Sequence, residues 1–251
     1  MKVSRAWAPI NRVGVELEGG WSYIPVGSVP DGSVNDFGCE FSGELPSPAF
    51  PYWGSLQRWI QDHYPDFVDN SCGLHVHISL KNQGNYPRLM DDAFTNWAQR
   101  YLGHFWQKTR GLSLTEHSRL RHRLAGGNTY AQTEVRSLEQ RSLLRKTSIR
   151  YTHWNFCYAL HGTVECRILP MFATPDTALL GIASVIRCVN AWLYGGAQRV
   201  RGNPLSYNEA EVSNEVPTRL DESYTWIEPA AHSSRSSLFG LEVHDVPNFL
   251  G

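Results

Sequence analysis

The sequence predicts an α+β fold with an antiparallel sheet. Three segments, at 12–19, 73–80 and 162–169, alternate apolar and polar residues as strands do. Segments of helical periodicity separate them, without the regular strand–helix–strand rhythm of a parallel sheet. With 251 residues, the chain can form one large domain or two small ones and can bury a substantial core.

Two helices are predicted, one between the first and second strand segments and one between the second and third. The segment 53–64 places one side of a helix at Leu56, Trp59, Ile60 and His63. The segment 87–108 has a stronger apolar stripe, made of Met90, Phe94, Trp97, Tyr101, Leu102 and Phe105. These stripes are typical of helices that pack on a core. The Pro/Gly-rich stretches 25–32 and 43–54 are predicted to be loops.

A third helix has clear start and stop signals. Thr174 suits the N-cap and Pro175 suits the first helical position. The apolar positions that follow are Ile182, Ile186, Val189 and Leu193. Gly195 and Gly196 are expected to end the helix.

Composition favours a reduced, water-soluble protein. Hydrophobic residues make up 41% of the chain, the net charge is −1, and no apolar run is expected to span a membrane. The first residues lack the apolar core of a signal peptide. Five cysteines, without a CxxC pair, are typical of free thiols in the cytoplasm. We therefore expect a cytoplasmic protein without a disulfide framework or a zinc ribbon.

Charge is distributed unevenly along the chain. Between residues 108 and 150 there are ten Lys/Arg and three Asp/Glu, whereas residues 203–251 contain two Arg and eight Asp/Glu. A solvated helical face followed by an acidic tail explains most such patterns. The more specific interpretation is that the basic residues between 108 and 150 line a binding site for a phosphate-bearing ligand.

Each of the three expected strands carries two polar residues at positions i and i+2. The pairs are Glu16 and Glu18, His75 and His77, and Glu165 and Arg167. Each pair projects from one face of its strand, about 6.6 Å apart, and the apolar residues project from the other. That spacing suits carboxylates flanking two ions about 3.5–4 Å apart. Oxygen-rich donors with an imidazole favour Mg²⁺ or Mn²⁺, although a bare HxH is more often structural.

Four ordered motifs carry a family resemblance. They are GVELEG, DGSVNDFGCEFSGEL, CGLHVHISL and RYTHWNFCYALHGTVECRIL, between about residues 12 and 195. Together they resemble the amidoligase family of the glutamine synthetase and glutamate–cysteine ligase superfamily. The resemblance implies a curved, mainly antiparallel sheet that forms an open funnel, with helices on its back. It also implies a catalytic domain over 1–201, with 202–251 as an acidic extension packed on it.

The resemblance assigns roles to residues of these motifs. It implies a metal site made of Glu16, Glu18, Glu40, His75 and Glu165. It implies catalytic roles for Arg167, Arg150, His77 and Glu40. It implies nucleotide contacts from Arg150, Arg167, Asn155 and Ser33. Glu44 lies close to Glu40 within the second motif and matches the family pattern less closely. Cys166 stands where the family usually has an aromatic residue. This difference is expected to alter packing and not the chemistry of the site.

The implied function is an ATP-dependent carboxylate–amine ligase that forms an amide or isopeptide bond through an acyl phosphate. ATP and Mg²⁺ or Mn²⁺ would be required, and the substrates would be small-molecule or peptide carboxylates and amines. No membrane partner is expected, and a nucleic-acid partner stays open but is less favoured than small-molecule or peptide substrates. The alternatives are a metal-dependent hydrolase that uses the HxH and carboxylate cluster, or an inactive, ligand-binding relic of the fold. A serine or cysteine hydrolase is disfavoured, because no nucleophile motif is present.

Within the basic stretch, Arg150, followed by Arg141 and Arg145, is expected to face the phosphates. The cluster Arg119, Arg121 and Arg123 is expected to matter less.

Overall fold

The computed structural model describes residues 9–90, 92–109, 112–131, 151–156 and 162–199. It is an α+β protein with an open, five-stranded antiparallel sheet, so the coarse fold prediction is confirmed. The strands are β1 (Ile10–Trp21), β2 (Phe41–Pro46), β3 (Gly73–Leu80), β4 (Trp154–Asn155) and β5 (Val164–Pro170). The helices are α2 (Trp53–His63), η1 (Gln83–Asn85), α3 (Tyr86–Leu89), α4 (Asp92–Lys108), α5 (Leu114–Leu124) and α8 (Pro175–Arg199).

Strand β3 occupies the middle of the sheet, in the order β2-β1-β3-β5-β4. The register places Glu16 of β1 opposite His75 of β3, and His77 of β3 opposite Glu165 of β5. Neighbouring strands lie about 4.7–4.9 Å apart. Polar residues from three distant sequence segments therefore become direct cross-strand neighbours.

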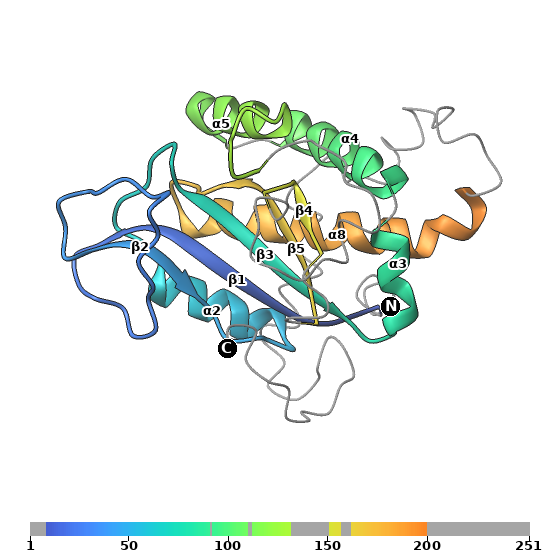
Figure 1. Cartoon of the computed structure of the whole chain (residues 1–251), viewed down its shortest axis with the longest axis horizontal. Helices are drawn as coiled ribbons and strands as arrows, with labels where there is room; N and C mark the ends of the chain where they lie inside the picture. The colour runs from blue at the N-terminus through green and yellow to red at the C-terminus, as the bar shows by residue number, and fades with distance from the viewer. Residues whose placement is uncertain (1–8, 91, 110–111, 132–150, 157–161, 200–251) are drawn as a thin grey trace.

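The other face of the sheet is apolar and is covered by α8, which passes behind the strands in Figure 1. Val15, Val76 and Cys166 are buried there together with the apolar side of α8. Gly181 allows the close approach of this helix, because a Cβ at that position would lie 2.7 Å from Phe172. Helices α2 and α4 pack against α8, and α5 lies beside β5. The core is thus concentrated on one side of the sheet.

Three local predictions are corrected by the structure. The stretch 43–54 is not a loop: it contains most of β2 and the start of α2. Pairing with β1 overrides the poor strand propensity of Gly43, whose missing side chain makes room for the carbonyl oxygen of Val29. The segment 87–108 is divided between α3 and α4.

The predicted stop at Gly195–Gly196 is also wrong, since α8 continues to Arg199. Two glycines lower helix propensity by about 1 kcal/mol each but do not forbid the conformation. The predicted N-cap is confirmed: the Thr174 hydroxyl accepts a hydrogen bond from the backbone N–H of Thr177.

By length and composition alone, one helix of the described residues, part of α8, is long and apolar enough to cross a membrane. The segment is Pro175–Leu193, with mean hydropathy 1.2. However, 67% of it is buried inside the protein, as in the core helix of a folded domain.

Candidate functional site

The three polar pairs meet on one face of the sheet and are buried. Exposure is at most 8% for every member of the set Glu16, Glu18, His75, His77, Glu165 and Arg167. Burial of so many ionisable groups is costly unless each is paired or coordinates an ion. Their contacts therefore define what this face can bind.

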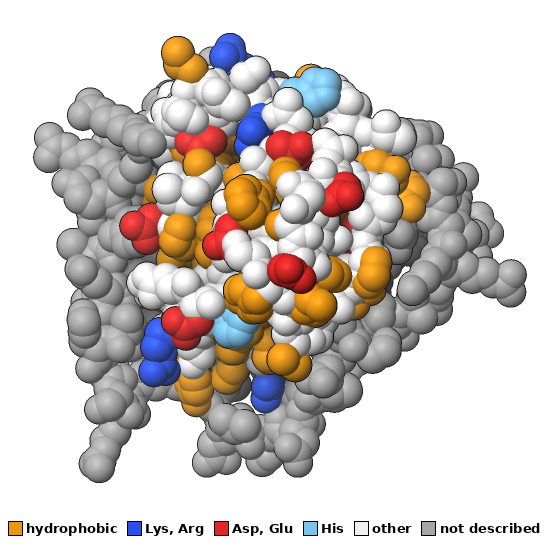
Figure 2. Space-filling view, turned by 90° about the vertical axis from the view of Figure 1, so that its left-hand side faces the viewer, with side chains coloured by type: hydrophobic (Ala, Val, Ile, Leu, Met, Phe, Trp, Pro, Cys, Tyr) orange, Lys and Arg blue, Asp and Glu red, His pale blue; other side chains and the backbone are white. Residues whose placement is uncertain are grey.

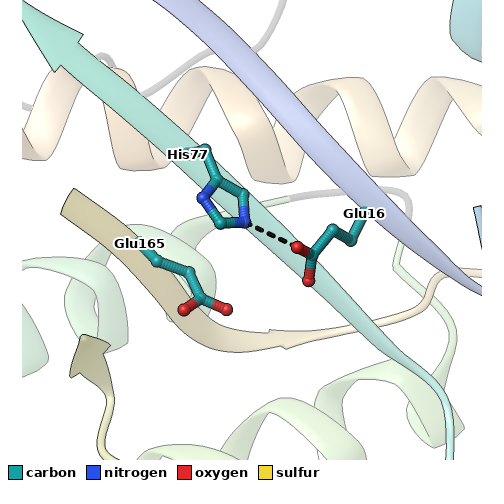
Figure 3. Close-up of side chains that lie close together, drawn as sticks. All are labelled: Glu16, His77 and Glu165. Atoms are coloured by element: carbon teal, nitrogen blue, oxygen red, sulfur yellow. Dashed lines mark hydrogen bonds and ion pairs between the residues drawn. The ribbon is translucent and has the colours of Figure 1, made fainter. Parts of the chain in front are cut away.

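The first group of possible metal ligands is Glu16, His77 and Glu165, called the inner group here. One ligand atom from each lies within 4.8 Å of the others. The side chains come from β1, β3 and β5 and converge above β3, with a 3.0 Å contact between His77 Nε2 and Glu16 Oε1 (Figure 3). Asn155 Nδ2 donates a hydrogen bond of 2.6 Å to Glu165 Oε2, and Arg167 donates to the other carboxylate oxygen.

A second group comprises Glu18, Asp31 and Glu44, called the outer group, whose ligand atoms also lie within 4.8 Å of one another. Glu18 and Glu44 are direct partners in the β1–β2 register. The N–H and hydroxyl of Ser33 both donate to Asp31 Oδ1, which fixes that carboxylate. Like charges opposite each other destabilise a sheet. A bound cation would remove this repulsion.

His75 links the two groups. Its Nδ1 lies 2.8 Å from Glu16 Oε2 and 3.5 Å from Glu165 Oε1. Its Nε2 lies 3.2 Å from Glu18 Oε1. The ring therefore faces carboxylates through both nitrogens, and the two groups form one continuous site.

The inner carboxylates are ionised at neutral pH. Burial alone would raise the pKa of Glu16, but the charges and hydrogen bonds of His77 and His75 outweigh it and hold the pKa well below its usual value. Burial likewise opposes ionisation of Glu165, whose pKa is lowered by Arg167 and His77. The pKa of Arg167 is raised by Glu165 and Glu16 despite its burial.

Glu44 behaves in the opposite way. Its pKa is raised to about 7, first by burial and then by the Glu16, Asp31 and Glu18 carboxylates, against the lowering effect of His75. Ionisation of Glu44 is therefore opposed by its burial and by repulsion from the neighbouring carboxylates. Lone carboxylate clusters are common on protein surfaces, but here the carboxylates are buried or half-buried and joined to a second group.

Acidic side chains also lie among apolar ones on the end of the molecule where β1 finishes, and basic side chains lie nearer its periphery (Figure 2). Asp36, Glu40 and Asp66 belong to the loops at this end and are exposed. A cation that approaches from this end therefore meets a negative surface.

The sequence interpretation missed Arg123. This guanidinium reaches the site from α5 and is 4% exposed. It donates hydrogen bonds to the carbonyl oxygens of Cys72 at 3.0 Å and of Arg167 at 3.5 Å. Burial lowers its pKa, and the Glu18 carboxylate partly offsets that effect. Arg123 was grouped with two arginines expected to matter little, whereas the structure places it against the strand ends.

The other site residues predicted from the sequence lie partly at the two ligand groups and partly outside them. Glu40 is exposed and belongs to neither group, whereas Glu44 belongs to the outer one. Ser33 is half-buried and orients Asp31, and Asn155 holds Glu165. Arg150, Arg141 and Arg145 lie outside the described residues, as does the acidic extension 202–251.

Comparison of the chain with protein-family models, curated proteins and solved structures gives no match.

Replacement of Glu44 by glutamine is expected to stabilise the metal-free protein at about pH 8 and to leave it nearly unchanged at about pH 5. Between pH 4.5 and about 7, folded Glu44 keeps a proton that the unfolded chain has lost. Its contribution to stability therefore falls as pH rises through this window and stays low above it. Glutamine resembles the neutral form at every pH.

Urea denaturation in the presence of a chelator, at several pH values, measures this effect. The exposed carboxylate Glu40, changed to glutamine, is the matched control. A Glu44→Gln effect of equal size at all pH values would contradict the prediction.

Proposed function

We propose that the protein is an ATP-dependent carboxylate–amine ligase of the amidoligase type, which binds two divalent cations. One observation supports this most strongly: two groups of possible ligands, linked by His75, lie beside buried guanidinium groups on one sheet face. The finer fold, a funnel like the catalytic domain of glutamine synthetase, is part of the same proposal.

The donor set fits Mg²⁺ or Mn²⁺. The two groups supply five carboxylates and one imidazole, and hard cations prefer oxygen ligands. The crowding that raises the pKa of Glu44 to about 7 is relieved when positive charge enters the outer group. Glu16, His77 and Glu165 would hold one ion, and Glu18, Asp31 and Glu44 the other. Bound ions supply Lewis acidity and neutralise charge on transferred phosphoryl groups.

The protein's own residues would position and stabilise the reacting groups. Joining a carboxylate to an amine in water is unfavourable, so a phosphoryl group is first transferred from ATP to a carboxylate oxygen, and ADP leaves. The amine then attacks the acyl carbon, an amide forms, and phosphate departs. Arg167, already oriented by Glu165 and the carbonyl of Tyr130, is suited to stabilise the phosphoryl oxygens.

Covalent catalysis by a buried cysteine is a poor alternative at this site. Burial raises the pKa of Cys72 to about 11 and that of Cys166 to about 12. Thiols with such pKa values carry little thiolate at neutral pH, and the thiolate is the nucleophile.

The function is tested by incubating the protein with ATP, Mg²⁺ and a pooled library of amines and carboxylates. Mass spectrometry should find products lighter than the sum of two library members by one water, together with ADP and phosphate. Omission of ATP or of Mg²⁺ should abolish them. Breakdown of library members without any nucleotide would instead support the metal-dependent hydrolase.

A further inference from the structure

Exposed apolar side chains gather on the loop that follows β1 and on one residue beside it. Among the described residues, seven large hydrophobic side chains are exposed. Five of them, called the apolar surface here, are 45% to 99% exposed: Tyr23, Ile24, Val26, Val29 and Phe67. Figure 2 shows apolar side chains interspersed with acidic ones at this end of the molecule. Single exposed hydrophobic residues are normal, whereas a group of them marks an interaction surface.

Hydrogen bonds hold the parts of the apolar surface together. The Asp66 carboxylate accepts a hydrogen bond of 2.8 Å from the Ser22 N–H, which fixes the start of the loop beside Phe67. Farther along the loop, Val29 and Glu44 exchange two backbone hydrogen bonds, of 2.9 and 3.0 Å. The loop is thus fixed at two points while its apolar side chains stay exposed.

The charged side chains next to the apolar surface are carboxylates. The ring of Phe37 stacks on that of Phe67, with centroids 6.3 Å apart, and so brings its chain neighbour Asp36 to this surface. Asp36, Glu40 and Asp66 are exposed. A backbone hydrogen bond lowers the pKa of Asp66, which is therefore charged at neutral pH. The apolar surface thus has a negative rim.

This charge selects among possible occupants. No lysine or arginine occurs in residues 13–57 or 59–80, which contain six and three Asp/Glu respectively. A negative surface repels the phosphates of nucleic acids and of anionic lipids. A symmetric contact between two copies would place the same carboxylates opposite each other. A cationic polypeptide with apolar side chains matches both features of the surface.

We propose that the apolar surface docks a basic segment of a partner protein, whose apolar side chains cover Ile24 and Val26 and whose Lys or Arg side chains pair with Asp36 and the neighbouring carboxylates. Burial of apolar atoms supplies the affinity, and the charges select the partner and speed its approach. The same loop carries Asp31 of the outer group, so the docked partner lies beside the candidate site.

Binding of full-length protein to three synthetic peptides of equal length, measured by fluorescence anisotropy, tests this. The first peptide alternates lysine with leucine, the second lysine with serine, and the third glutamate with leucine. Only the first combines positive charge with apolar side chains. We expect the other two to bind at least about 10-fold more weakly, because each lacks one of the two contributions.

Two double variants separate the apolar contribution from the charge. Ile24→Ser with Val26→Ser should weaken binding of the lysine–leucine peptide at least about 10-fold. These side chains are 67% and 99% exposed, so serine removes no core contact. Asp36→Asn with Glu40→Gln should weaken it about threefold to 10-fold and reduce its salt dependence. The matched control is Leu114→Ser on α5, 88% exposed and outside the apolar surface, which should leave affinity within about twofold.

Equal affinity for the lysine–leucine and lysine–serine peptides would reduce the contact to charge attraction and overturn the proposal. It would also be overturned if Leu114→Ser weakened binding as much as the Ile24 and Val26 double variant, or if the wild type bound none of the peptides. Analytical ultracentrifugation and phosphatidylcholine vesicles test two other occupants. Self-association or vesicle binding that the same double variant abolishes would assign this surface to a second copy or to a membrane, and the proposal would be wrong.

Discussion

Replacing Glu16 by alanine is expected to weaken Mn²⁺ binding by at least about 100-fold. Glu16 contacts His77 through one carboxylate oxygen and His75 through the other, so it belongs to the inner group and touches the link to the outer one. Loss of a residue that merely orients a ligand costs about 10- to 100-fold in metal affinity, and loss of a ligand should cost at least as much. His75→Ala and Glu165→Ala should also weaken binding.

Calorimetric titration with Mn²⁺ measures the effect, and thermal unfolding checks that each variant remains cooperatively folded. Glu40 and Glu44 provide a matched comparison four residues apart. Glu44→Ala should impair binding, because Glu44 lies within the outer group, whereas the exposed Glu40→Ala should not. Wild-type affinity in the Glu16, His75 and Glu165 variants would show that these are ordinary buried polar residues.

The central strands could be predicted because their signal is local. Side chains alternate with a period of two, so the faces of β1, β3 and β5 can be assigned from sequence. The edge strand β2 could not, since Gly43 and Pro46 both disfavour strands. It forms because β1 supplies its hydrogen-bonding partner. Such pairing is a tertiary effect with no signature in the segment itself.

In the candidate site, too, the residues with a local sequence signal could be predicted, and those that depend on strand pairing could not. The pairs on three strands were found because two residues at i and i+2 must share a face. Whether Glu40 or Glu44 joins the possible metal ligands depends on the β1–β2 register, which pairs Glu18 with Glu44. Spacing along the chain does not determine that register.

Arg123 was overlooked for a related reason. Its helix is signalled by a capping box, in which Ser113 and Glu116 bond each other reciprocally. Arg119 and Arg123 are four residues apart in this helix, so the sequence alone predicts that their side chains lie on the same face. The sequence does not show which face of α5 turns toward the sheet, because that depends on how the helix packs beside β5.

The second large effect is expected at Arg167, whose replacement by alanine should reduce turnover by about 10²- to 10³-fold. The guanidinium is fixed by the Glu165 carboxylate and the Tyr130 carbonyl, and it lies over the ring of Tyr151 at 5.9 Å. Arg167→Lys should not restore full activity, because an ammonium group cannot reproduce the planar arrangement of donors. Steady-state measurement of ATP-dependent product formation gives kcat and KM for each variant.

A structural role for Arg167 and a direct role in phosphoryl transfer can be separated by pH. Arg167 lowers the pKa of Glu165, so its loss should raise that pKa and move the acidic limb of the kcat profile to higher pH. If Arg167 only keeps Glu165 ionised, activity should recover at alkaline pH. If it also stabilises the transferring phosphoryl group, a large deficit in kcat should persist well above that limb. Recovery to wild-type kcat at high pH would therefore contradict the phosphoryl role and leave Arg167 as a residue that positions Glu165.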